Sequence, residues 1–465
     1  MRRVTALGVL LLAAPLAAQQ VPDSSLLTVE RIFGGEFRSD VFGPVRWLGD
    51  GTSYSTLERS TDTSASGGGR DLVRYDAATG ARTVLVASAR LVPPGAAQPL
   101  TLDEYSWSDD GTKLLIFTNS EQVWRQNTRG DYWVLELTTW QLKKLGGDGP
   151  ASTLMFAKFS PGGGGRVGYV RYGEYNVYVE DLGTGQITRL TADGSRTTIN
   201  GTFDWVYEEE LDLRDGWRWS PDGRWIAYWQ LDATGVRDFL LINDTDSLYS
   251  LTVPVQYPKA GATNSAGRVG VVSAAGGDTR WLDVPGDRRN NYIARMEWIG
   301  GWADGRMGGS AALVIQHLNR LQNTLHVMLA DPATGQVRTI LTERDSTAWV
   351  ELTDPLTFVN GGRDFVWLSD RTGWTHLYLV SRGGRQVRPI TRGNWDVLGY
   401  SGVDATGRWV YFTASPDNPA QRYLYRARLD GRGTAERLTP PGTGGVNSYN
   451  LAPGFRFAVH AFSNM

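Results

Sequence analysis

The fold is indicated most clearly by Trp219-Ser220-Pro221-Asp222-Gly223, which precedes the apolar run Trp225-Ile226-Ala227-Tyr228. Proline presets the backbone for the first turn position, aspartate bonds its own backbone, and glycine takes the left-handed position. The segment therefore predicts a tight turn between two β-strands. Two further copies are Trp107-Ser108-Asp109-Asp110-Gly111, which precedes Leu114 to Phe117, and Phe159-Ser160-Pro161-Gly162, which precedes Val167 to Val170.

A second type of turn alternates with the first along the chain. Its clear copies are Asp76 to Gly80, Asp181 to Gly185 and Asp331 to Gly335, and each is followed by a short strand-like segment. Two hairpins in each repeat make four strands, and four-stranded blades around a channel are the architecture that reuses such a unit. We therefore predict an all-β fold, an eight-bladed β-propeller of four-stranded blades. A pair of β-sandwiches is the alternative.

The composition agrees with a β-rich chain and excludes several classes of function. The 465 residues include 56 glycines, 18 tryptophans and 19 tyrosines, which suits many turns joined to aromatic strands. With 47 basic and 49 acidic residues, there is no basic excess for binding nucleic acid. There is no cysteine, and the four histidines are scattered. We expect no metal and no cofactor.

The N-terminus has the pattern of an export signal. Arg2 and Arg3 precede an apolar run from Val4 to Ala17, which small residues end. The run is shorter than the roughly 20 residues that a membrane helix needs, although a retained anchor is the alternative. We expect residues 1–18 to be a cleaved signal peptide, residues 19–40 an N-terminal segment and residues 41–465 the propeller. The mature protein would then be secreted or periplasmic, with no membrane contact.

One segment departs from the repeat. Asp204-Trp205-Val206-Tyr207-Glu208-Glu209-Glu210-Leu211 places three carboxylates after an aromatic cluster that favours burial. On a helical turn, neighbouring glutamates diverge by only about 100°, so that two of them could face the same ligand. A pair of carboxylates suits a cation such as the α-ammonium group of a peptide. The alternative is an ordinary solvated helix start or loop.

This acidic segment, the Trp219 turn after it and Tyr257-Pro258-Lys259-Ala260-Gly261-Ala262-Thr263-Asn264 resemble the dipeptidyl peptidase IV family. The resemblance implies that Glu209 and Glu210 bind the free amino terminus of a peptide substrate. Trp124-Arg125-Gln126 resembles the strand whose arginine contacts the carbonyl of the second substrate residue, which makes Arg125 the third site residue.

The resemblance also implies a serine exopeptidase that releases Xaa-Pro or Xaa-Ala dipeptides. The catalytic half of the family is an α/β-hydrolase domain with a Gly-x-Ser-x-Gly nucleophile elbow, and no such elbow occurs in these 465 residues. We therefore expect a truncated or split enzyme whose partner is a separate hydrolase domain, inactive by itself. A stand-alone propeller that binds peptides or proteins is the alternative.

The resemblance makes a geometric prediction. Glu209 and Glu210 should project from a short helical or irregular insertion at the end of the channel where a hydrolase domain would dock. Arg125 should reach them from another blade, because the amino group and the second carbonyl of a dipeptide are only a few ångströms apart. Glu208 should point elsewhere, toward backbone or a basic partner.

Overall fold

The computed structural model describes residues 25–38, 42–61, 69–300, 302–303, 306–307, 311–352, 356–404 and 406–464. The predicted signal peptide lies outside these residues. The chain divides into two units, and the boundary between them lies between Gly43 and Pro44. The first unit contains helix α1 (Val29–Phe33), which begins after Thr28, whose hydroxyl accepts a hydrogen bond from the Arg31 N–H.

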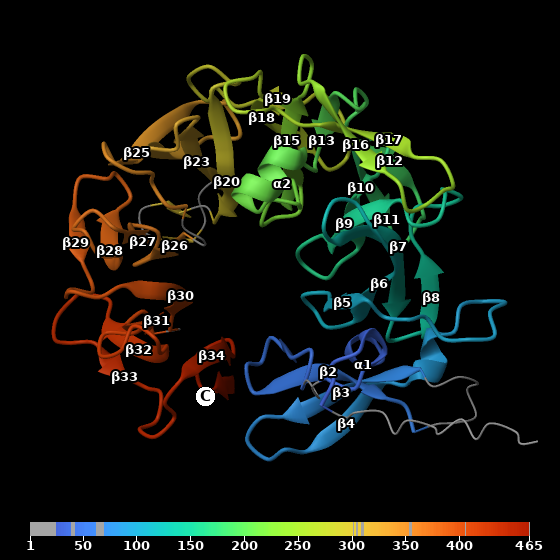
Figure 1. Ribbon diagram of the computed structural model, residues 1–465, viewed down its shortest axis with the longest axis horizontal. Helices are drawn as coiled ribbons and strands as arrows, with labels where there is room; N and C mark the ends of the chain where they lie inside the picture. The colour runs from blue at the N-terminus through green and yellow to red at the C-terminus, as the bar shows by residue number, and fades with distance from the viewer. Residues whose placement is uncertain are drawn as a thin grey trace, which may run out of the picture. The chain divides into compact units, whose positions relative to one another are not determined.

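The second unit, from Pro44 onward, is a succession of antiparallel sheets that follow one another around a ring (Figure 1). The first sheet contains β1 (Arg46–Trp47), β2 (Ser53–Arg59), β3 (Arg70–Asp76) and β4 (Arg82–Val86). The second contains β5 (Glu104–Trp107), β6 (Lys113–Gln122), β7 (Asn127–Glu136) and β8 (Gln141–Lys144). The third contains β9 (Leu154–Phe159), β10 (Arg166–Arg171), β11 (Asn176–Asp181) and β12 (Ile187–Arg189). Because β9 also pairs with β7, the second and third are joined in one sheet of eight strands.

The remaining sheets continue the ring in chain order. The fourth contains β13 (Thr198–Asn200), β14 (Trp217–Trp219), β15 (Trp225–Asp232), β18 (Ala266–Ser273) and β19 (Arg280–Trp281). The fifth contains β20 (Asn291–Ile299), β23 (Ala312–Asn319), β24 (Thr324–Ala330) and β25 (Val337–Arg344). The sixth contains β26 (Thr357–Val359), β27 (Asp364–Ser369), β28 (His376–Ser381) and β29 (Val387–Pro389). The seventh contains β30 (Val397–Val403), β31 (Trp409–Ala414), β32 (Tyr423–Arg428) and β33 (Glu436–Arg437).

The eighth sheet is smaller. It contains β34 (Val446–Leu451) and β35 (Ala458–Ser463), so within the described residues it differs from the four-stranded blades that the sequence predicts. Two short hairpins lie outside the eight sheets, β16 (Asp238–Asn243) with β17 (Leu251–Gln256), and β21 (Trp302–Ala303) with β22 (Arg306–Met307). Besides α1 and α2 (Trp205–Leu211), the described residues contain one short 3₁₀ helix, Ser88–Leu91. The all-β propeller is confirmed.

The repeated turn works as its residue types indicate. The Ser108 hydroxyl donates to the Asp110 carboxylate at 2.6 Å and accepts from the Lys113 N–H at 2.9 Å. Ser220 makes the same two bonds, to Asp222 at 2.6 Å and from Trp225 at 2.9 Å. The two copies therefore fold alike, which explains why this pattern predicts the repeat.

Contacts between the first and last sheets close the ring. The Trp47 indole N–H donates to the backbone oxygen of Asn450 at 3.1 Å, and the Asn450 amide donates to the backbone oxygen of Val45 at 3.2 Å. Gly51, in the turn after β1, lies against the backbone of Pro453. We call these five residues the seam. The apolar core lies within and between the blades, with Trp217, Trp229 and Trp367 among its largest buried side chains.

Candidate functional site

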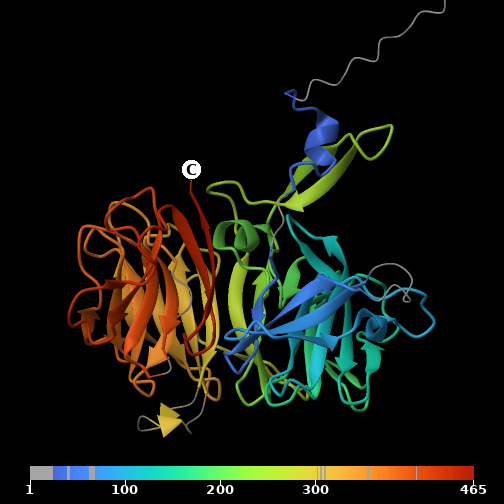
Figure 2. The same ribbon diagram turned by 90° about the horizontal axis from the view of Figure 1, so that it is seen from below.

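Helix α2 is an insertion in the first strand of the fourth blade. β13 pairs with one end of β15 and β14 with the other, so that together they fill the place of a single strand. The chain between them leaves the sheet and forms α2, which Figure 1 shows on the inner side of the ring and Figure 2 at one end of the blades. A strand that is interrupted at this point delivers its inserted residues to one face of the ring.

Buried contacts hold α2 in a single position. Asp204 caps its N-terminus, because the carboxylate accepts hydrogen bonds from the Tyr207 N–H at 3.1 Å and the Ser265 hydroxyl at 2.6 Å. The Tyr207 hydroxyl accepts from the Ile293 N–H of β20 at 3.2 Å. The Arg295 guanidinium donates to the backbone oxygen of Leu211 at 2.9 Å. The short helix is therefore fixed against the neighbouring blade.

Arg125 meets Glu209 from a different blade. Arg125 lies in the turn between β6 and β7, and its Nε is 2.7 Å and 2.6 Å from the two carboxylate oxygens of Glu209. The two residues are 84 positions apart. The Glu209 side chain is only 15% exposed, whereas that of Arg125 is 74% exposed. The carboxylate of this ion pair is thus largely buried, whereas the guanidinium is open to solvent.

Glu210 follows Glu209 on the same helical turn and is exposed. Among the residues that the structure describes, its carboxylate has no hydrogen bond or ion pair. Two carboxylates and one guanidinium leave this group of three side chains with a net negative charge. The arrangement can accept one further cation.

Glu208 has a partner of its own, Arg214. It is buried, and its carboxylate lies 3.4 Å from the Arg214 guanidinium. Burial raises the pKa of Glu208 to about 7, although Arg214 acts in the opposite direction. Arg214 also pairs with Asp212, which ends α2 in a left-handed conformation.

The structure brings two of the three residues predicted for the site, Arg125 and Glu209, into contact, and it places Glu210 beside them. It puts the glutamates on a helical insertion and gives Glu208 a basic partner. Sequence reasoning did not name Arg214 as that partner. A signal was available, because Arg214 follows the acidic run by only a few residues. The roles of Arg125, Glu209 and Glu210 in binding a substrate stay predictions.

Among the described residues, no cluster of three or more histidine, aspartate or glutamate side chains is arranged to hold a metal ion. Within those same ranges, no helix has the length and apolar character to cross a bilayer.

Antiparallel blades in a ring, with a charged cluster built by an inserted helix and a hairpin of another blade, define a β-propeller with a candidate binding site at one end. The sequence profile of the dipeptidyl peptidase IV N-terminal region matches residues 108–465, and the chain belongs to that family.

Relatives and solved structures support the same assignment. Dipeptidyl aminopeptidase B of Saccharomyces cerevisiae is 26% identical over 379 residues, which cover 78% of this chain and 44% of that protein. A probable dipeptidyl-aminopeptidase B of Emericella nidulans is 27% identical, covering 94% and 49%. The crystal structure of Porphyromonas gingivalis dipeptidyl peptidase 4 matches with a TM-score of 0.81 at 26% identity, covering 94% of this chain and 58% of that one. The chain spans about half the length of the curated relatives that it matches.

Proposed function

We propose that the chain is the substrate-binding propeller of a dipeptidyl peptidase IV-like serine exopeptidase. Glu209 and Glu210 hold the free amino terminus of a peptide, and Arg125 contacts the carbonyl of its second residue. The observation that carries this proposal is the contact between Arg125 and Glu209, which joins two blades at one point. A dipeptide needs partners for its amino group and its second carbonyl within a few ångströms of each other.

The charges of the group favour an ammonium ion as the ligand. The guanidinium of Arg125 faces Glu209 alone, and the exposed Glu210 has no cationic partner in the described part of the chain. An α-ammonium group has three donors and is protonated below about pH 8. It would share Glu209 with Arg125 and balance the charge of Glu210.

The fixed helix supports selectivity for a free amino terminus. Because Asp204, Tyr207 and Leu211 anchor α2, Glu209 does not need to be ordered when a ligand binds. A preorganised carboxylate loses less conformational entropy on binding than a mobile one. A fixed anchor for the amino group would also set how far a peptide can extend past it, which would limit cleavage to the second bond.

We propose in addition that an α/β-hydrolase domain supplies the nucleophile, the general base and the oxyanion hole. Within these 465 residues no Gly-x-Ser-x-Gly elbow is present. The substrates would be peptides that yield Xaa-Pro or Xaa-Ala dipeptides. The N-terminal pattern of Arg2, Arg3 and the apolar run supports export to the periplasm or the medium.

The test is a calorimetric titration of the chain with Ala-Pro-amide and with N-acetyl-Ala-Pro-amide, which lacks the ammonium group. We expect the free amine to bind and the acetylated peptide not to bind. Glu209→Gln and Glu210→Gln should each weaken binding by roughly tenfold or more, since hydrogen bonds to charged groups contribute about 1.5–3 kcal/mol. Glu208→Gln, on the same helix, is the matched control and should leave binding unchanged.

Equal binding of the two peptides would refute the assignment of the carboxylates. A second experiment joins the chain to a hydrolase domain of the family and measures dipeptide release. A chain that binds the free amine but gains no activity when joined would be a stand-alone peptide-binding propeller.

A further inference from the structure

The segment that carries α2 leaves the fourth blade and returns to it at one place. The Gly216 N–H donates to the backbone oxygen of Gly201 at 3.1 Å, and both glycines bond to the backbone of Trp229 on β15, at 3.0 Å and 2.9 Å. A Cβ on Gly216 would lie only 2.7 Å from the backbone of Gly201. Residues 202–215 therefore form a loop with a narrow base. We call residues 213–216, which lead from α2 back to β14, the return stem.

Lys158, on the first strand of the third blade, holds the return stem from the side. Its Nζ lies 2.6 Å from each carboxylate oxygen of Asp215 and donates to the backbone oxygen of Trp217 at 2.7 Å. The same atom lies 3.9 Å from the centre of the Trp217 ring. Burial lowers the pKa of Lys158 to about 8, although the Asp215 carboxylate acts in the opposite direction, so the ammonium group is charged at neutral pH. These contacts fix the point where the chain rejoins the blade.

Arg218 continues the contact to the fifth blade. Its guanidinium donates to the backbone oxygen of Asp215 at 2.9 Å and lies 3.4 Å from the Asp215 carboxylate. The same guanidinium pairs with Glu297 on β20. A chain of alternating charges thus joins the first strands of three consecutive blades through the return stem: Lys158, Asp215, Arg218 and Glu297.

The return stem is connected to α2 by side chains and by backbone. The Arg214 guanidinium lies 3.4 Å from the carboxylate of Glu208 on the helix. The Leu213 N–H donates to the backbone oxygen of Tyr207 at 3.1 Å. A displacement of the stem would therefore be transmitted to the helical turn that carries Glu209.

We propose that Lys158 is a positioning residue for the candidate site: its bond to Asp215 fixes the return stem, and the stem holds the turn of α2 that carries Glu209. The inference rests on the proposed function, because Lys158 acts on peptide binding through Glu209 and not by touching the peptide. The alternative is an ion pair that only stabilises the junction of two blades. That alternative predicts the same effect on α2 from any lysine that joins two blades.

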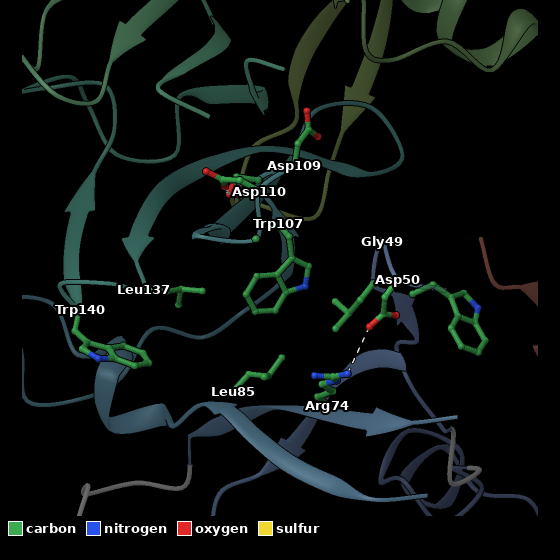
Figure 3. A pocket seen from close by; sticks show the side chains of 13 residues that line it. Gly49, Asp50, Arg74, Leu85, Trp107, Asp109, Asp110, Leu137 and Trp140 are labelled. Carbon is green, nitrogen blue, oxygen red and sulfur yellow. Dashed lines mark hydrogen bonds and ion pairs between the residues drawn. The ribbon is translucent and has the colours of Figure 1, made fainter. Parts of the chain in front are cut away.

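Lys113 is the matched control, because it also joins two blades. Its Nζ donates to the backbone oxygen of Gly163 in the third blade at 3.1 Å. Asp110, in the turn before Lys113, is among the residues around a cavity between the first two blades in Figure 3. Strand β6 begins at Lys113 and spans on the order of 30 Å, so the control lies at the opposite end of the second blade from Arg125.

The first test measures hydrogen exchange of the full chain by mass spectrometry, without ligand. Lys158→Met keeps an apolar side chain on the Trp217 ring but removes the charge, and it should raise exchange in residues 205–211 about tenfold, because the stem loses charge-assisted hydrogen bonds. Asp215→Asn should have a similar effect, and the double variant should add little to it. Lys158→Arg keeps the charge and should restore slow exchange. Lys113→Met should leave exchange in α2 unchanged.

The second test titrates the same variants with Ala-Pro-amide by calorimetry. Lys158→Met should weaken binding about fivefold, because the ligand would then have to order the helix. Lys158→Arg should recover most of the affinity, and Lys113→Met should bind as the unmodified chain does.

Three outcomes would overturn the proposal: unchanged exchange in α2 of a folded Lys158→Met chain, faster exchange there with unchanged affinity, or an equal loss of affinity in Lys113→Met. A different result would refute the proposed function instead. If the unmodified chain binds no Ala-Pro-amide, yet Lys158→Met and not Lys113→Met speeds exchange in α2, then Lys158 positions the helix but the helix does not bind peptides.

Discussion

Replacing Gly51 by alanine should open the seam. Gly51 has a φ of 62°, a conformation that costs an alanine about 1 kcal/mol. A Cβ at this position would also lie 2.2 Å from the backbone oxygen of Pro453, and no side-chain rotation can relieve a contact with backbone. The first and last blades must therefore separate locally, which breaks the hydrogen bonds of Trp47 and Asn450. Each of these bonds contributes about 1 kcal/mol to stability. We expect Gly51→Ala to lower the free energy of unfolding by about 3 kcal/mol.

The matched control is Gly80→Ala. Gly80 has a similar φ of 70°, but a Cβ there meets nothing within 4 Å, so only the conformational cost of about 1 kcal/mol applies. Both variants would be compared with the unmodified chain by urea denaturation and differential scanning calorimetry. Equal destabilisation by the two alanines would refute the reasoning, because the seam would then contribute nothing.

Three further predictions concern the candidate site. Arg125→Ala should change the free energy of unfolding by less than about 1 kcal/mol, because the Arg125 side chain is 74% exposed, yet it should weaken binding of Ala-Pro-amide. A large loss of stability with unchanged binding would make Arg125 structural. Glu208 has a pKa of about 7 in the folded chain against an ordinary value of 4.5, so the folded state keeps a proton that the unfolded state releases. The stability of the unmodified chain should therefore fall relative to that of Glu208→Gln as the pH rises from about 4.5 to about 7. A difference in melting temperature between the two proteins that stays constant over this range would contradict this. The chain alone should release no p-nitroaniline from Gly-Pro-p-nitroanilide, and turnover that a serine-reactive phosphonate blocks would reveal a nucleophile.

Much of the fold could be predicted because its signals are local. Ser108 and Ser220 make their bonds within five residues, so the turn that they build is visible in the order of the residues. The insertion at α2 was visible for the same reason, since it breaks the repeat. The candidate residues Glu209 and Arg125 came from a family resemblance, and their contact across 84 positions could not be derived from spacing.

Other features depend on tertiary packing, which the order of the residues suggests but does not settle. The pairing of Glu208 with Arg214 follows from the way the chain leaves α2, and several arginines were available in sequence. Trp140 is another case. It has a φ of 60°, close to the 70° of Gly80 in the first blade, so a tryptophan stands where this type of turn has glycine, and the turn is harder to recognise from the sequence.

The seam also bears on when the ring can close as the chain is synthesised. Each blade is built largely from strands that are close in the chain, so blades can form one after another during synthesis. The bonds of the seam join residues that are 403 and 405 positions apart, and they have no local substitute. Until the segment around Asn450 has been synthesised, the residues of the first blade that take part in the seam have no partner. Closure of the ring therefore has to wait for the eighth sheet, however early the first blade is made.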